Sequence, residues 1–551
     1  MSFVSRLGLG LVAVSALAQS VQIRVLATTD LHGNIYPYDY YSGKPAERGL
    51  AKLATLIKQE RTANTLLVDC GDTIQGTPLE TVHESAVKRG DKSPDPMMLA
   101  MNELHYDSMT VGNHEFNYGL ENLVAAHKIA KFPWLAANVD GPSGFLPSIT
   151  KTIGGVRVTV IGVVTPTIPS WERPENYKGL TFVDPVARVK KIASDLRREN
   201  KTDIIIVAAH SGLDRDPKGG AKLTEDLPGE NVAYEIAEQT PVDAVIFGHT
   251  HAELGEYHVG NVIMMQPRNW GISLGEMDFT VNRAGGKWTV AKVTSHTIPV
   301  TSAVPPDETI LAIGKPYHDA AEAYLSKPVT KVSSPLSMEY SRVEDTALID
   351  AIQDVQQKET GAPVSFASAF ITSARVPAGE MTVRQVAALY PYDNTLYKIA
   401  GTGKMIREAL ENSARFYKTC TGDCSTGPLI NPAIIGYNYD MAQGVEYEID
   451  LRKPEGSRIV NLRYQGQPLD DGKAVDIAVN SYRAGGSGGY SVFKDAKILW
   501  RSSEEIRDMM IRYYTEKGEL PAAPDENWRV LPEAAHQELR REASRERPTA
   551  K

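Results

Sequence analysis

The chain has 551 residues, of which 42% are hydrophobic, and a formal net charge of −9 at pH 7. This length predicts two or more domains with cores of ordinary size. The acidic balance gives no basic surface of the kind that binds duplex nucleic acid or anionic membranes, so we expect neither as the main partner.

Residues 1–18 have the features of a secretory signal. Arg6 supplies positive charge, the apolar run from Leu7 to Ala18 is too short to span a bilayer, and Ala16-Leu17-Ala18 fits a cleavage site. The alternative is a frayed first strand. No second long apolar run follows, so no membrane span is expected, and the sequence predicts a periplasmic or secreted protein without separating the two.

The next part of the chain predicts a first domain over residues 19–300. After a first strand, the helical spacing of apolar residues from Gly49 to Glu60 gives a βαβ start, and a second helix is expected over 94–106. Residues 156–164 have the pattern of a strand. Residues 257–299 alternate apolar and polar side chains, as in an antiparallel sheet that closes the domain.

The second half predicts a linker, a further domain and a tail. Prolines flank an alanine-rich helical stretch over 301–331, which we interpret as a linker helix, and a second domain is expected over 332–520. Residues 521–551 are polar and predict a loosely docked or disordered tail. Cys420 and Cys424 could close a short disulfide loop, since a metal site there lacks further nearby ligands, and Cys70 is expected to be a buried thiol.

Five strand-like runs end in residues that can bind a metal ion. In chain order they lead to Asp30 with His32, to Asp72, to Asn113 followed by His114, to His210, and to His249 with His251. In open α/β sheets, ligands bind beyond the carboxyl ends of the strands. Both i, i+2 pairs would place their two side chains on one side of an extended backbone.

Each of these residues has an ordinary explanation when taken alone. An Asp after a strand is most often a turn or helix-capping residue, by roughly ten to one. A lone His is usually a surface or hydrogen-bonded side chain. The joint pattern is different, because five of the 12 histidines occur at the ends of such runs. The pattern therefore indicates a metal site.

These stretches, in this order, resemble the calcineurin-like metallophosphoesterases and, within them, the 5′-nucleotidase family. The resemblance extends from about residue 22 to about residue 515. It implies an α/β protein of two domains. The first would be an N-terminal four-layer α/β-β/α metallophosphoesterase sandwich, and the second a C-terminal α+β domain of the 5′-nucleotidase type.

The resemblance also implies a site for two divalent metal ions. One ion would be held by Asp30, His32, Asp72 and His251, and the other by Asp72, Asn113, His210 and His249. His114 would be the catalytic histidine that binds no metal and that gives a proton or hydrogen bond to the leaving oxygen. Oxygen and imidazole ligands without thiolate suit Mn, Zn, Co or Fe, and two such ions can activate water for an in-line displacement.

Position 117 distinguishes branches of the family. Many 5′-nucleotidases have Asp three residues after the catalytic histidine, whereas this chain has Asn117. An amide can orient the imidazole but does not raise its basicity as a carboxylate does. The stretch Asn117-Tyr118-Gly119 and the loop Asp39-Tyr40-Tyr41 resemble the 2′,3′-cyclic-nucleotide 2′-phosphodiesterase/3′-nucleotidase branch.

Three residues of the second domain are assigned to the substrate by resemblance. Arg375 would contact the phosphate, although an exposed turn arginine is the simpler explanation. Relatives hold the base between two aromatic rings placed like Tyr439 and Tyr482, and stacking contributes about 1–3 kcal/mol per base. For Tyr437 we prefer ordinary packing, and residues 390–396 are expected mainly to pack the core.

The sequence therefore predicts a secreted two-metal phosphoesterase that opens 2′,3′-cyclic nucleotides to 3′-nucleotides and then releases phosphate. The first domain would perform the chemistry and the second would hold the nucleoside. One alternative is a 5′-nucleotidase or UDP-sugar hydrolase on the same scaffold. Another is a catalytically silent nucleotide-binding surface protein, which the complete set of ligand positions disfavours. We expect a monomer whose partner is a small nucleotide.

Overall fold

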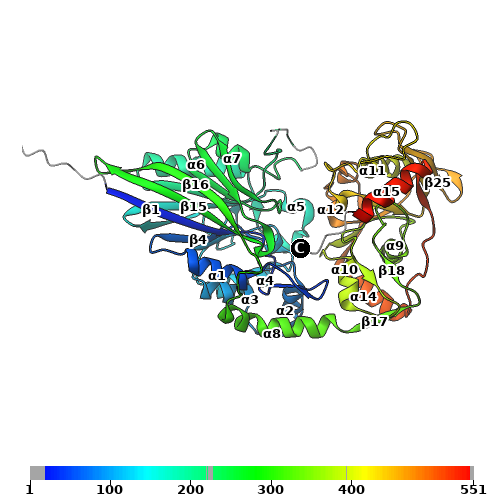
Figure 1. Ribbon diagram of the computed structural model, residues 1–551, viewed down its shortest axis with the longest axis horizontal. Coiled ribbons are helices and arrows are strands. Elements are labelled where there is room, and N and C mark those ends of the chain that lie inside the picture. Colours follow the sequence, from blue (N-terminus) through cyan, green and yellow to red (C-terminus); the bar gives the residue numbers. More distant parts are fainter. Residues whose placement is uncertain (1–18, 219, 221, 223–226, 393, 546–551) are drawn as a thin grey trace, which may run out of the picture.

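The computed structural model describes residues 19–218, 220, 222, 227–392 and 394–545. It shows two lobes joined along one edge by the long helix α8 (Glu308–Leu325) (Figure 1). The predicted secretory signal over residues 1–18 lies outside the described residues. Within the described ranges, no helix is both long enough and apolar enough to cross a membrane.

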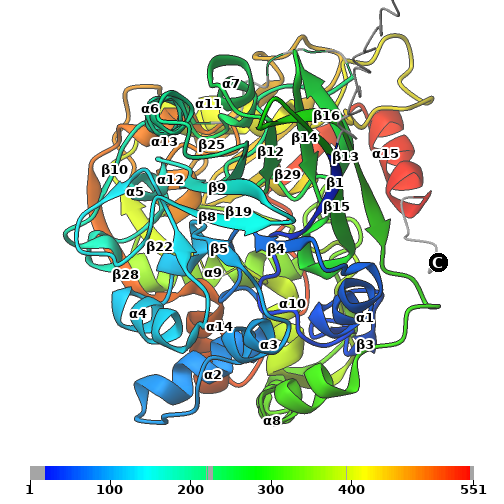
Figure 2. The ribbon, with the colours of Figure 1, turned by 90° about the vertical axis from the view of Figure 1, so that its left-hand side faces the viewer.

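The first domain contains two six-stranded sheets that pack face to face (Figure 2). The first sheet has the order β16 (Lys287–Pro299), β15 (Ser273–Ala284), β1 (Gln19–Thr28), β4 (Thr65–Asp69), β5 (Ser108–Thr110) and β6 (Trp134–Leu135). The second has the order β13 (Leu254–Val259), β14 (Val262–Gln266), β12 (Ala244–Phe247), β11 (Ile204–His210), β9 (Val156–Val164) and β8 (Ser148–Ile153). The predicted antiparallel closing strands are confirmed, because β15 pairs antiparallel with β16.

The alternation of side chains along β11 explains the layers. Ile204 and Ile206 pack into the apolar layer between the two sheets, whereas Ile205 and Val207 pack outward. A strand buried on both faces needs a continuous apolar run, which this segment has. Helices α6 (Pro185–Arg198) and α7 (Ala233–Gln239) cover the outer face of this sheet. The outer face of the first sheet is covered by four other helices, namely α1 (Leu50–Glu60), α2 (Pro78–Lys88), α3 (Pro96–Glu103) and α4 (Leu120–Ile129). The predicted four-layer sandwich is confirmed.

The second domain is an α+β unit with two sheets. The five-stranded sheet has the order β23 (Asp440–Gln443), β19 (Val364–Ser368), β27 (Ile477–Asn480), β22 (Thr395–Ile399) and β28 (Ile498–Glu505). The four-stranded sheet has the order β26 (Gln467–Pro468), β25 (Ile459–Tyr464), β24 (Glu446–Asp450) and β29 (Trp528–Leu531). Its helices are α9 (Ala347–Thr360), α10 (Val383–Leu389), α11 (Gly403–Ala414), α12 (Ser481–Ala484), α13 (Ser491–Lys494), α14 (Ile506–Lys517) and α15 (Glu533–Arg545).

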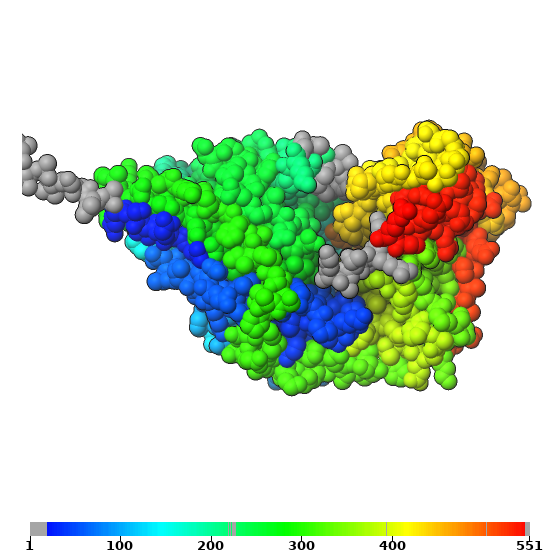
Figure 3. Space-filling model, viewed as in Figure 1, coloured from blue at the N-terminus to red at the C-terminus, as the bar shows by residue number. Residues whose placement is uncertain are grey.

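Four short two-stranded ribbons also occur among the described residues. They pair β2 (Tyr38–Asp39) with β3 (Lys44–Pro45), β7 (Val139–Asp140) with β10 (Thr181–Phe182), β17 (Pro328–Val332) with β21 (Gly379–Thr382), and β18 (Leu336–Ser337) with β20 (Arg375–Val376). The loop at β2 reaches the second domain, where the Arg384 guanidinium donates to the Tyr40 carbonyl at 2.5 Å. Figure 3 shows this dark-blue first-domain segment lying against the second domain.

Residues 521–545 are folded, which corrects the prediction of a loose tail for this part of 521–551, and residues 546–551 lie outside the described residues. β29 pairs in parallel with β24, and the Trp528 ring stacks on Tyr447 with centroids 6.1 Å apart and planes at 9°. Leu539 of α15 is fully buried. The composition of the segment is polar, but its few apolar residues are placed to complete a sheet and a helix face.

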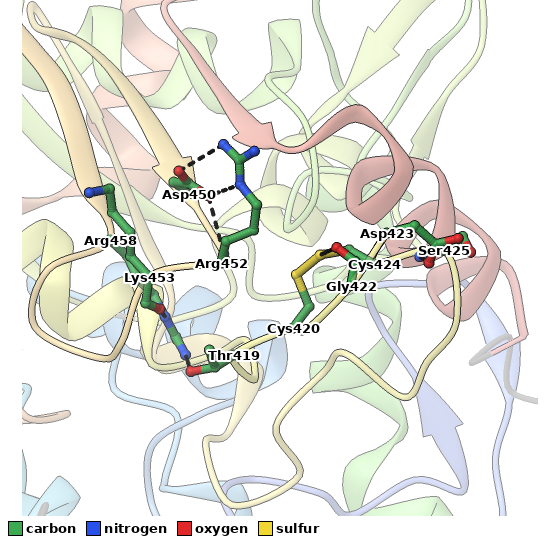
Figure 4. Close-up of a disulfide and its surroundings, with 10 residues drawn as sticks. All are labelled: Thr419, Cys420, Gly422, Asp423, Cys424, Ser425, Asp450, Arg452, Lys453 and Arg458. Carbon is green, nitrogen blue, oxygen red and sulfur yellow. Dashed lines mark hydrogen bonds and ion pairs between the residues drawn. A yellow bond between two sulfur atoms is a disulfide. The ribbon is translucent and has the colours of Figure 1, made fainter.

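The two cysteine predictions agree with the structure. Cys420 and Cys424 form a disulfide in the loop after α11 (Figure 4), and Cys70 is a buried free thiol. A helix was predicted between the domains, and α8 occupies that place. It packs against α1, α2 and α3, so the link between the domains is attached to the first domain over much of its length.

Candidate metal centre

The seven predicted metal ligands converge at the carboxyl ends of strands from both sheets. Asp30 and His32 follow β1, Asp72 follows β4, Asn113 follows β5, His210 ends β11, and His249 and His251 follow β12. Six of these ligands form two groups, and within each group the ligand atoms lie within 4.8 Å of one another. The first group is Asp30, His32 and His251, and the second is Asp72, His210 and His249. These groups match the two ion sites that the resemblance implies.

In the first group, two imidazoles face each other. His32 Nε2 lies 3.0 Å from His251 Nε2, and His251 Nε2 lies 3.5 Å from Asp30 Oδ1. The other nitrogen of His32, Nδ1, is 2.8 Å from the Gln75 carbonyl oxygen, to which it donates. Nε2 of His32 therefore carries a lone pair toward the group, which is the arrangement of a histidine prepared to bind a metal.

The second group is arranged in the same way around Asp72 and Asn113. Asp72 Oδ2 lies 3.0 Å from His210 Nε2, and Asn113 Oδ1 lies 3.1 Å from the same nitrogen. Asn113 Oδ1 is also 2.9 Å from His249 Nδ1. His210 donates through Nδ1 to the Cys70 carbonyl at 2.8 Å, so its Nε2 is the atom offered to the site. Asp72 Oδ2 lies 3.7 Å from His32 Nε2 of the first group, which suits a bridging carboxylate.

The backbone at this site is strained. Asp30, His32, Asp72, His249 and His251 have φ values of 50°, 48°, 57°, 73° and 54°. Left-handed backbone costs about 1–3 kcal/mol for each such residue and is concentrated at functional sites. This corrects the prediction that the i, i+2 pairs lie on extended backbone, because the chain reverses after each strand and the pairs converge through that reversal.

The pKa values of the ligand histidines show that a bound metal ion would take the place of a proton. Burial lowers the pKa of His32 to about 4. For His210 burial also acts to lower the pKa, but the Asp72 carboxylate outweighs it and raises the pKa to about 10. Ligand imidazoles must be neutral, so a metal ion displaces this proton on binding. The donor set of carboxylate, imidazole and amide oxygen fits divalent ions.

A buried carboxylate, Glu115, holds the two central loops together. It accepts hydrogen bonds from the backbone amides of Asp72 at 2.9 Å and Gly112 at 2.6 Å. Gly112 has no room for a side chain, since a Cβ atom there would lie 2.2 Å from Asp72 Oδ1. Sequence analysis assigned Glu115 no role, although its place directly after Asn113 and His114 is the signal that could have suggested one.

The predicted catalytic pair lies beside the ligands. His114 donates its backbone amide to Asp72 Oδ1 at 2.8 Å, and its ring centroid is 5.1 Å from that of His32. His114 Nδ1 is 2.6 Å from Asn117 Oδ1. The Asn117 amide nitrogen in turn donates to Glu172 Oε2 at 2.7 Å. Glu172 was missed because it is far from this motif in the sequence.

Tyr482 of the second domain lies next to the metal centre, with the Trp171 ring between it and His249. Its ring stacks on Trp171 with centroids 5.3 Å apart and planes at 11°, and Trp171 also stacks on His249. Trp171 ends helix α5 (Ile168–Trp171), which meets α12 across the domain boundary (Figure 1). One face of Tyr482 is thus covered by the first domain, and Trp171 is a second residue that sequence analysis missed.

Tyr439 is a core residue, contrary to the prediction that it stacks on a base. Its side chain is fully buried against the rings of Phe416, Tyr417 and Trp528. Tyr437, for which packing was preferred, is 41% exposed instead. Tyr437 lies within the short 3₁₀ turn over Gly436–Asn438, and Tyr439 directly follows that turn, so the two side chains have different surroundings.

Two other residues of the second domain, Arg375 and Tyr392, are exposed to solvent. Arg375 is exposed and pairs with Glu339 Oε2 at 2.6 Å, while also donating to the carbonyls of Thr372 and Ala374. Tyr392, which was expected mainly to pack the core, is 43% exposed and makes an edge contact with Phe370. Tyr392 is thus a further aromatic ring open to a ligand.

The sandwich and its ligand set define the first domain as a calcineurin-like phosphoesterase. The family model with that description matches residues 23–253, and the model of the 5′-nucleotidase C-terminal domain matches residues 326–495. The chain belongs to the 5′-nucleotidase family of calcineurin-like metallophosphoesterases, which confirms the identification made from the sequence.

Similar proteins agree with this family. The chain is 31% identical over 597 residues to the 2′,3′-cyclic-nucleotide 2′-phosphodiesterase/3′-nucleotidase of Salmonella typhimurium, covering 95% of this chain and 91% of that protein. It is 32% identical over 592 residues to the trifunctional nucleotide phosphoesterase protein YfkN of Bacillus subtilis, but spans only 40% of that protein. The crystal structure of a putative 5′-nucleotidase from Staphylococcus aureus superposes with a TM-score of 0.80 at 26% identity, covering 93% of this chain and all of that one.

Proposed function

We propose that this protein is a metal-dependent phosphoric ester hydrolase that acts on nucleotides. Its favoured reaction would open 2′,3′-cyclic nucleotides to 3′-nucleotides, which it then hydrolyses to nucleoside and phosphate. The observation that carries the proposal is the convergence of the seven ligand side chains and His114 at one place, next to Trp171 and the Tyr482 ring of the other domain. The names of the similar Salmonella and Bacillus proteins support it.

The residues divide the work between them. Asp30, His32 and His251 would hold one divalent ion, Asn113, His210 and His249 a second, and Asp72 both. Such ions supply Lewis acidity and an activated water when bound, and Mn, Zn, Co or Fe would suit these donors. His114 donates to the leaving ribose oxygen, and its partner Asn117 fixes the direction in which it does so.

Tyr482 would bind the base, because an aromatic ring next to the metal centre can stack on any nucleobase. In the observed arrangement Trp171 covers one face of that ring, so the base must use the other face or enter while the domains are apart. A phosphate contact by Arg375 would require Arg375 to exchange Glu339 for the substrate. The polypeptide is proposed to be exported and to act as a monomer.

The preference for cyclic diesters rests on the groups around His114. A cyclic diester carries one negative charge and some ring strain, so it depends less on a firmly held proton than a dianionic monoester does. With an amide at position 117, we place cyclic diesters first, 3′-monophosphates second and 5′-monophosphates last. A 5′-nucleotidase or UDP-sugar hydrolase is the second candidate, favoured by the overall likeness to the Staphylococcus structure.

The experiment is a substrate panel on the purified, metal-loaded enzyme. We expect kcat/KM to decrease from 2′,3′-cyclic AMP to 3′-AMP and then to 5′-AMP and UDP-glucose. If 5′-AMP or UDP-glucose is hydrolysed faster than the first two substrates, the second candidate replaces the first. If no phosphate ester is turned over while nucleotides still bind, the protein is a binding protein.

A further inference from the structure

A chain of hydrogen bonds connects the catalytic histidine to a carboxylate on another element. His114 Nδ1 contacts Asn117 Oδ1 at 2.6 Å, and Asn117 Nδ2 contacts Glu172 Oε2 at 2.7 Å. Glu172 follows α5, the helix whose Trp171 stacks on Tyr482. The carboxylate that Asn117 lacks is therefore present one link further from the imidazole.

Glu172 is held firmly in this place. Its Oε1 accepts from the backbone amide of Arg173 at 2.7 Å and from Asn176 Nδ2 at 2.8 Å. Asn176 also donates to the Asn117 carbonyl at 3.1 Å. Burial raises the pKa of Glu172, while the hydrogen bonds from Asn117, Arg173 and Asn176 act to lower it. Because these three contacts all come from N–H groups, the geometry favours the ionised carboxylate, which only accepts. Short contacts of this kind, with a charged acceptor, are about twice as strong as neutral ones.

This arrangement decides which way the Asn117 amide faces. A carboxylate accepts only, so the amide must present its nitrogen to Glu172 and its oxygen to His114. The Asn117 oxygen is an acceptor, so the imidazole must carry its hydrogen on Nδ1. His114 Nε2 is then the nitrogen that serves the substrate.

We propose that Glu172 is a positioning residue for His114, fixing its ring orientation and tautomer through Asn117. The inference rests on the proposed function and adds to it the reason why an amide can stand at position 117. In the reaction, water adds its oxygen to phosphorus and releases one proton to solvent. The bond from phosphorus to the ribose oxygen breaks, that oxygen takes a proton from His114 Nε2, and solvent reprotonates the imidazole.

The test exchanges the amide and the carboxylate. In Glu172→Gln the new side-chain amide can offer either its oxygen or its nitrogen to Asn117. The Asn117 amide is then no longer forced to turn its oxygen toward His114. We expect kcat for 2′,3′-cyclic AMP to fall by about 10–100-fold with little change in KM, as for other residues that orient a catalytic or ligand histidine. Asn117→Asp places two carboxylates against each other and should lower kcat as well.

The double variant Asn117→Asp/Glu172→Gln should recover most of the activity that either single variant loses. In it, the glutamine amide donates to the new aspartate, and the aspartate still accepts from His114 Nδ1. Glu175→Gln is the matched control, because Glu175 is an exposed glutamate of the same segment, and we expect it to behave as the wild type. Thermal unfolding of each variant shows that it is folded.

The leaving group supplies a readout that a merely structural role would not change. Bis-p-nitrophenyl phosphate has a leaving group that needs no proton, whereas diphenyl phosphate has a poorer one. Glu172→Gln should therefore slow diphenyl phosphate much more than bis-p-nitrophenyl phosphate. Equal losses on the two esters, or a double variant no better than the worse single variant, would overturn the proposal. This comparison uses no nucleotide, so it stands apart from the substrate panel that tests the proposed function.

Discussion

Two tyrosines of the second domain, both assigned to the base by resemblance, should behave in opposite ways when each is changed to Ala. Tyr439 is fully buried among three aromatic rings, and removing such a side chain costs about 3–5 kcal/mol. For a domain of this size, about 2–4 °C per kcal/mol gives a fall in Tm of about 6–20 °C. Tyr439→Ala should leave KM for nucleotides almost unchanged at a temperature where the protein is folded.

Tyr482→Ala should instead raise KM for 2′,3′-cyclic AMP. The loss of stacking, about 1–3 kcal/mol, corresponds to about 5- to 150-fold. Bis-p-nitrophenyl phosphate, which has no base, should keep its KM. Tyr439→Phe, which retains the ring, serves as the control for stability. The reasoning is refuted if Tyr439→Ala keeps the wild-type Tm and raises KM, or if Tyr482→Ala harms both substrates equally.

Three other predictions concern the metal centre and the C-terminal helix. Asp72→Ala should lose metal at both sites and reduce turnover to background, because Asp72 faces both ligand groups; full metal content by elemental analysis would contradict this. Asp72 raises the pKa of His210, so His210 must release a proton before it can bind a metal ion. Metal affinity should therefore rise by about tenfold per pH unit for each proton released. Titration calorimetry at several pH values measures this, and an affinity that does not change with pH would contradict the reasoning. Leu539→Ala should lower the free energy of unfolding by about 2–5 kcal/mol, whereas the exposed Gln537→Ala should not, and equal stability of the two variants would mean that α15 is not docked.

The clustering of the candidate metal ligands could be predicted from the sequence because its signals are local. Each ligand is of a distinctive type and directly follows an apolar run, so its place at a strand end follows from the run itself. The backbone reversals at Asp30, His32 and His249 could not be foreseen, because a side chain in left-handed backbone leaves no pattern of its own. The four-layer sandwich followed from apolar runs such as that of β11, which must be buried on both faces.

The errors have physical causes of two kinds. Tyr437 was expected to pack and Tyr439 to stack on the base, but Tyr437 lies in the exposed turn at Gly436–Asn438 and Tyr439 is buried directly after it, a difference that the local residues do not reveal. The segment after residue 520 is polar on average, and the average hides Trp528 and Leu539, which are buried. Glu172 lies on a different element from His114, so only the folded chain brings the two together.

The most direct test of a two-metal phosphoesterase is to locate the ions. Crystals of the protein reconstituted with Mn or Zn should give two anomalous peaks about 3.5–4 Å apart, the spacing of dinuclear hydrolytic sites. One peak should lie against Asp30, His32 and His251, and the other against Asn113, His210 and His249, with Asp72 contacting both. A single peak, or two peaks that do not share Asp72, would contradict the account.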